Sequence, residues 1–176
     1  MKSPQVPFLR MIQHRAARVA VGPSAARGQG GPGVVAAARG FLRRVKLARF
    51  GTANQRVFTR SLDTANRRLM AALPSRSSSW GLARKLLNIF LRDCLYTGYL
   101  SKAYGLQAAE RFLEIPLDSV TAKRLRELAP ELRRWSRVKH LDPKTSAAYQ
   151  EAALAEAERK GMARVHLDAD WHGGRE

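Results

Sequence analysis

The spacing of apolar residues predicts helices along most of the chain. Between residues 52 and 73, apolar side chains recur at steps of three and four, the spacing of one helical face. The members of this face are Phe58, Leu62, Ala65, Leu69 and Leu73. Pro74 and the serine-rich run after it end the segment. A second helix is predicted over residues 80–99, again with one apolar side.

Shorter helices are expected on both sides of these two. Weaker helical signals begin near Gly40, and a short helix is predicted over 107–113. Residues 114–117 read as extended, because Pro116 disfavours helix just before it. Asp118 or Ser119 then caps a helix through Leu128.

The last long helix is predicted from Pro143, in the first turn, to Gly161, which is suited to a helix end. A short segment, 163–172, follows it. No convincing strand alternation occurs along the chain. The pattern therefore predicts an all-α fold, an irregular bundle of five to seven helices.

The first 40 residues differ from the rest. They mix Arg with Gly, Pro and Ala, a composition with little to bury, which predicts a disordered basic tail over 1–40 and a helical domain over 41–176. Two alternatives stay open for this stretch. It resembles an organellar targeting peptide, and residues 8–21 would suit a basic amphipathic helix at a membrane surface.

Charge is concentrated toward the N-terminus. The 176 residues carry a formal net charge of +18, and residues 1–79 hold 15 basic side chains but only one acidic one, Asp63. Residues 80–176 hold 17 basic and 13 acidic side chains. Such an excess favours a polyanionic partner, most often nucleic acid. We expect DNA more than RNA, and no membrane partner; the oligomeric state is left open.

The single cysteine, Cys94, excludes several classes of protein. A disulfide framework, a four-cysteine zinc site and an iron–sulfur cluster all need more thiols. We expect a reducing compartment, cytoplasmic or nucleoid-associated. No apolar run reaches the roughly 20 residues that span a bilayer. No cofactor is expected.

Two segments together resemble a known family. GLARKLLN at 81–88 and IPLDSVTAKR at 115–124 are similar to the core of the helix-hairpin-helix DNA glycosylases of the endonuclease III type. The resemblance covers about residues 80–124. It implies a DNA-binding protein of base-excision repair, with Lys85 and Asp118 at the catalytic lysine and aspartate. It also places Gly81 at the first hairpin glycine and Asn88 at the asparagine after the lysine.

The implied chemistry is coherent. A glycosylase extrudes its base and needs a carboxylate to stabilise the positive charge that develops on the sugar. A lysine of lowered pKa can attack the sugar and form a Schiff base. The expected catalytic residues are therefore Lys85 and Asp118. The expected nucleic-acid-binding residues are Gly81, Arg84, Asn88, Arg92, Lys123, Arg124, Arg43 and Arg44.

Less specific interpretations remain open. Lys85 suits a solvated helix surface or a phosphate contact, and Asp118 suits an N-cap alone. The chain would then be a non-catalytic nucleic-acid-binding protein, or an interaction protein whose basic tail docks an acidic partner. HLDADWH at 166–172 would align metal-like side chains on one side of a strand. Four ligands from one stretch rarely converge, so no metal site is expected, and Asp168 has Arg164 as a nearby partner.

Overall fold

The computed structural model describes residues 6–22, 25, 28 and 33–173, and within these ranges every regular element is helical. The α-helices are α1 Val6–Ala20, α2 Val34–Leu42, α3 Gln55–Ala72, α4 Trp80–Tyr96, α5 Gly98–Tyr104, α6 Ser119–Leu128, α7 Pro143–Arg159 and α8 Leu167–Gly173. Short 3-10 turns are η1 Leu47–Arg49, η2 Leu106–Phe112, η3 Val138–His140 and η4 Arg164–His166. The predicted all-α irregular bundle is confirmed, although the eight α-helices of the described residues exceed the five to seven expected.

Side-chain caps fix several helix starts. Asn54 accepts from the backbone N–H of Val57 at 3.1 Å and begins α3. Asp142 accepts from the N–H of Thr145 at 2.8 Å, and Pro143 follows it in the first turn of α7. These local signals satisfy backbone donors that the first helical turn leaves unpaired. They explain why the sequence located these helices well.

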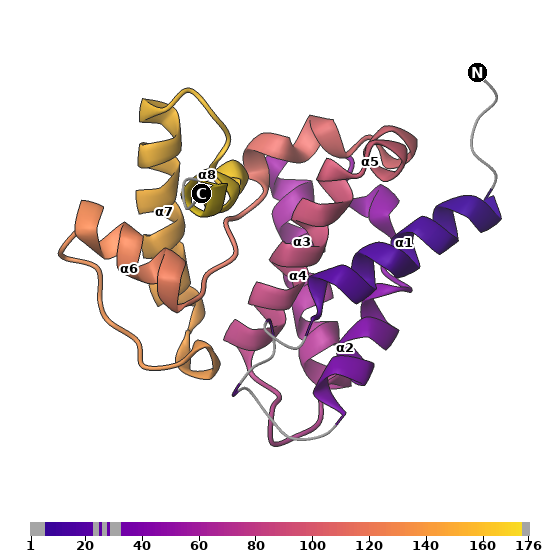
Figure 1. Cartoon of the computed structure of the whole chain (residues 1–176), viewed down its shortest axis with the longest axis horizontal. Helices are drawn as coiled ribbons and strands as arrows, with labels where there is room; N and C mark the ends of the chain where they lie inside the picture. Colours follow the sequence, from indigo (N-terminus) through magenta and orange to yellow (C-terminus); the bar gives the residue numbers. More distant parts are fainter. Residues whose placement is uncertain (1–5, 23–24, 26–27, 29–32, 174–176) are drawn as a thin grey trace.

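The helices form two units joined at residues 113–117 (Figure 1). One apolar cluster gathers residues of α1 to α5 and η2 around α4, and the N-terminal unit, residues 6–113, is built on it. A second cluster gathers residues of α6, α7 and α8 around Tyr149 of α7, in the C-terminal unit, residues 114–173. Val138 and Val165 of the C-terminal unit pack into the first cluster. The two units are therefore in contact.

The described N-terminal residues 6–20 are helical and packed, which differs from the predicted disordered tail. Leu9, Ala17 and Ala20 of α1 are buried, and α1 packs on α4. Gln13, also buried, donates from Nε2 to the carbonyls of Leu42 at 3.1 Å and Val45 at 2.8 Å. The buried stripe of α1 is made mostly of alanine, which composition alone does not distinguish from tail sequence. Residues 1–5, 23–24, 26–27 and 29–32 of the expected tail lie outside the described residues.

The same packing bears on the amphipathic-helix alternative. Of the large apolar side chains of α1, Leu9 and Ile12 pack on the protein core, whereas Met11 and Val19 are exposed. Within the described residues, no helix combines the length and apolar character needed to cross a bilayer.

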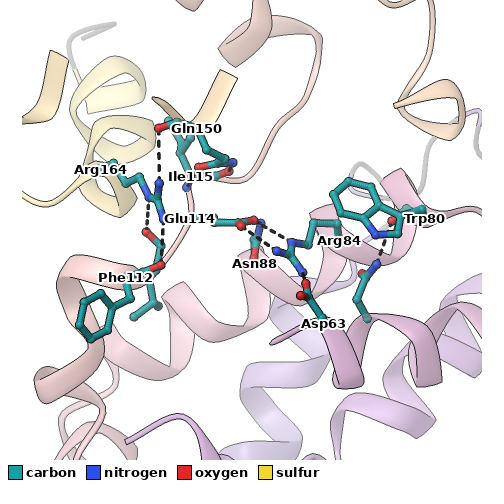
Figure 2. A network of polar contacts seen from close by, with 11 residues as sticks. Asp63, Trp80, Arg84, Asn88, Phe112, Glu114, Ile115, Gln150 and Arg164 are labelled. Carbon is teal, nitrogen blue, oxygen red and sulfur yellow. Dashed lines mark hydrogen bonds and ion pairs between the residues drawn. The ribbon is translucent and has the colours of Figure 1, made fainter. Parts of the chain in front are cut away.

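A buried polar network fixes the junction between the units (Figure 2). Glu114, whose side chain is 13% exposed, accepts two bonds from Arg84, at 2.7 and 2.8 Å, and one from Asn88 at 2.9 Å. Arg84 also pairs with Asp63 at 2.9 Å. Burial by itself would raise the pKa of Glu114, but the Arg84 guanidinium and these hydrogen bonds outweigh it and lower that pKa.

The chain on the other side of Glu114 is held as firmly. Gln150 of α7 bonds both backbone groups of Ile115, accepting from N–H at 3.1 Å and donating to the carbonyl at 2.9 Å. Arg164 donates to the carbonyls of Phe112 and Leu113, each at 3.0 Å (Figure 2). Arg164 thus binds backbone carbonyls, and Asp168 forms its ion pair with Arg92 instead of the expected Arg164.

Candidate functional site

A cleft lies where the two units meet. Its walls come from the end of α1, one side of α4, the segment at Pro116 and the start of α8, and its volume is about 560 Å³. Its ionisable and phenolic lining residues are Lys85, Arg92, Asp93, Tyr96, Asp118 and Asp168. Lys85 and Asp118, 33 positions apart in the chain, therefore line one cavity.

Lys85 reaches this cleft from α4. Its ammonium donates to the carbonyl of Ala25 at 3.3 Å, and the side chain is partly buried. Burial lowers the pKa of Lys85, and the negative charges of Asp118 and Asp168 oppose that shift without cancelling it. The amine is therefore easier to deprotonate than that of an ordinary surface lysine.

Asp118 begins α6 from the opposite wall. Its Oδ1 accepts from the N–H groups of Val120 and Thr121, each at 3.0 Å, so the N-cap interpretation is confirmed. Capping and a role in the cleft are compatible, because the capped carboxylate still borders the cavity and its field reaches Lys85.

Arg92 is held by carboxylates within the cleft. It pairs with Asp93 at 3.0 Å and with Asp168 of α8, and Thr121 donates to the other oxygen of Asp168 at 3.5 Å. Burial raises the pKa of Asp93, although Arg92 opposes the shift. Arg92 of α4 thus links this helix to α8, and its positive charge is largely balanced by carboxylates of the protein itself.

Three of the expected nucleic-acid contacts are buried. Arg84 and Asn88 are 6% and 3% exposed, with their polar groups committed to Glu114 and Asp63. Gly81 lies in the first turn of α4, and a Cβ there would come within 2.1 Å of the Val138 carbonyl oxygen. As the apolar pattern predicted, a helix begins at Trp80, capped by Ser79, and the hairpin that the resemblance implies does not occur here. We assign none of the three to a binding surface.

The other expected contacts are exposed but lie apart. Lys123 and Arg124 project from α6 in the C-terminal unit, and Lys123 approaches Glu127 at 3.9 Å. Arg43 and Arg44 follow the end of α2 in the N-terminal unit. The structure therefore brings Lys85, Arg92 and Asp118 to one cleft and leaves these four outside its lining.

A larger basic surface surrounds the loop 43–50. Two neighbouring hollows share Arg44, Val45 and Lys46 and are lined by no acidic residue. The basic and imidazole side chains lining them, which we call the basic surface, are Arg10, His14, Arg43, Arg44, Lys46, Arg49 and Arg68. Only Arg43 and Arg44 were singled out from the sequence. The absence of any acidic residue before Asp63 was the available signal.

The metal-like string at 166–172 is not a strand. It runs through η4 into α8, where alternate residues do not share a face. His166 bonds Glu110 at 2.5 Å and Tyr96 at 2.9 Å, while Asp170 pairs with Lys160 at 2.5 Å. Among the described residues, no three His, Cys, Asp or Glu side chains are grouped to hold a metal ion.

Comparisons with protein-family models, curated proteins and solved structures give no match for this chain. The resemblance of residues 80–124 to helix-hairpin-helix glycosylases therefore stays a prediction from sequence.

Proposed function

We propose that this protein binds nucleic acid, with DNA as the expected partner, through the basic surface of its N-terminal unit. The observation that carries the proposal is the uneven charge of the two units. Residues 1–113 hold 20 basic and three acidic side chains, a net charge of +17, whereas residues 114–176 hold 12 and 11, a net charge of +1. Phosphate backbones attract such a surface independently of sequence.

The basic surface is also available for binding. Among the described residues, none of its side chains takes part in an ion pair, whereas Arg84 and Arg92 are paired internally. Most of its members are arginines, whose guanidinium groups bind phosphate oxygens in a bidentate manner. A charged surface whose side chains form no internal ion pairs among the described residues releases counterions from DNA at little cost to the fold.

Salt dependence of binding tests this proposal. We expect affinity for duplex DNA to fall steeply with salt, with a log–log slope of about −0.9 for each phosphate neutralised. The triple substitution R44A/R49A/R68A should flatten the slope by about two to three such units. Fluorescence anisotropy over a salt series, with RNA of the same sequence in parallel, measures both effects.

The matched control removes three charges from the other unit. Arg134, Arg137 and Lys139 are exposed near η3, and R134A/R137A/K139A changes the net charge by the same amount. We expect a smaller loss of slope from this control. Equal losses from the two triples would contradict the proposed surface, and a slope near zero for the native chain would contradict nucleic-acid binding itself.

A second candidate function concerns the cleft. Lys85 and Asp118 border the same cavity, and burial lowers the pKa of the Lys85 amine. These observations favour an amine nucleophile acting on a sugar aldehyde, as at an abasic site of DNA. The neutral Nζ adds to C1′ of the open-chain sugar, water leaves, and an imine forms. Asp118 would stabilise the cationic iminium.

Borohydride trapping on abasic-site DNA tests this second function. Hydride adds to the imine carbon and leaves a stable secondary amine that joins protein to DNA. We expect a covalent adduct with the native chain and none with Lys85→Arg, which keeps the positive charge but forms no imine. Lys102→Ala, at an exposed lysine of α5, is the control and should leave the yield unchanged.

Asp118→Asn separates capping from charge in the same assay. Asparagine keeps the cap acceptor, so folding should persist while the adduct forms more slowly. Absence of any adduct with the native chain, or an equal yield from Lys85→Arg, would eliminate this function and leave DNA binding as the only one.

A further inference from the structure

The smaller hollow of the basic surface is lined by cationic and hydroxyl side chains together with apolar ones. It has a volume of about 190 Å³ and lies between the end of α2, the loop 43–50 and the middle of α3. Its polar lining consists of Arg44, Lys46, Arg49, Ser61, Thr64 and Arg68. Four cations and two hydroxyl groups thus border one small space, and no carboxylate does.

The scaffold around this hollow is rigid. Gln13 binds the carbonyls of Leu42 and Val45, which fixes the chain where the cationic loop begins. Phe50, 3% exposed, closes the loop against Phe58 of α3, with ring centroids 5.9 Å apart. The backbone that carries these cations is therefore held in place before an anion binds.

We propose that this hollow binds the terminal phosphate of a nucleic-acid strand. The inference rests on the proposed nucleic-acid binding and names the group recognised. A space of about 190 Å³ is below the roughly 300–1,000 Å³ typical of sites that enclose a whole small molecule. It suits a phosphate group whose nucleoside stays outside.

Charge and shape favour a terminal phosphate over an internal one. A phosphomonoester carries a charge of about −1.5 to −2 at pH 7 and three acceptor oxygens on one substituent. An internal phosphodiester carries one negative charge, and the nucleic-acid strand continues from it in both directions. Four cations bordering a small space therefore match the monoester better.

The test compares oligonucleotides that differ only at one end. At equal ionic strength, we expect a strand with a 5′- or 3′-phosphate to bind about tenfold more tightly than the same strand with hydroxyl ends. Arg68→Ala should remove most of this preference while leaving weaker binding of the hydroxyl strand. Arg67→Ala is the matched control, because Arg67 is exposed beside Arg68 on α3 but does not line the hollow.

Each outcome decides a separate point. Salt-dependent binding without a preference for terminal phosphate overturns the hollow as its site and leaves the proposed function intact. A preference that Arg68→Ala preserves, or that Arg67→Ala removes equally, overturns the assignment to these residues. Binding of neither strand overturns the proposed function, and with it this inference. Inorganic phosphate should compete for the terminally phosphorylated strand more strongly than chloride at matched ionic strength.

Discussion

Glu114→Gln is expected to lower the free energy of unfolding by about 3 kcal/mol. The native carboxylate sits between Arg84 and Asn88 and is mostly buried. Glutamine keeps the shape but leaves the Arg84 guanidinium without its main counter-charge in a site that excludes water. Urea unfolding followed by circular dichroism measures the loss.

Asp63→Asn provides the comparison at the other end of the network. Asp63 pairs with the same guanidinium, but its side chain is 51% exposed, so its loss should cost less than about 1 kcal/mol. Glu151→Gln, on the exposed side of α7, should fall within about 0.5 kcal/mol of the native chain. Similar costs at Glu114 and Asp63 would show that burial does not set the strength of this network.

The network also predicts a pH dependence. Because the folded-state pKa of Glu114 is lowered, its contribution to stability is fully present above the unfolded glutamate pKa of about 4.3. The contribution is lost as pH falls through the lower folded-state value. The stability difference between the native chain and Glu114→Gln should thus be constant from pH 7 to 5 and shrink below about pH 4.

Gly81→Ala should destabilise the protein by about 2 to 3 kcal/mol. The added Cβ would lie 2.1 Å from the Val138 carbonyl oxygen and 2.8 Å from the Leu141 Cβ, both in the C-terminal unit. The nearest atom belongs to the backbone, which cannot move away by a rotamer change as a side chain can. The alanine therefore forces α4 and the η3 segment apart. Thermal unfolding measures the cost.

Gly98→Ala is the matched glycine substitution. A Cβ at Gly98 meets no atom within 4 Å, and the residue begins α5. Alanine should be neutral there or stabilising by up to about 1 kcal/mol. Equal destabilisation at both glycines would contradict close packing as the reason for glycine at position 81.

The sequence located the helices whose signals are local. α3, α6 and α7 begin at side-chain caps, and α3 ends just before Pro74, so their bounds can be read from neighbouring residues. The sequence offered α1 only as a helix at a membrane surface and did not predict α2, because both helices are stabilised by packing on α4 and α3 and composition does not reveal that packing. An alanine-rich stripe becomes a signal only when its partner surface is known.

The residues of the candidate site were predicted only in part, because some of their contacts depend on partners distant in the chain. Lys85 and Asp118 were paired by resemblance, and both border the cleft. The sequence did not show that Arg84 is buried in an ion pair while its neighbour Lys85 borders the cleft. The partner of Arg84, Glu114, lies 30 positions away in the chain. Only Arg43 and Arg44 of the basic surface were predicted, because the fold alone brings Arg10 of α1 and Arg68 of α3 near the same loop.

The junction at residues 113–117 sets how the molecule can respond to a ligand. Glu114 is bound to α4, while Ile115 is bound to α7 through Gln150. A linker bonded to both sides cannot act as a hinge without breaking buried hydrogen bonds. The cleft between the units should accordingly keep one width with or without an occupant. The size of ligand that the cleft accepts would then be set by the folded structure. Binding would require no movement of the two units and would therefore cost little free energy.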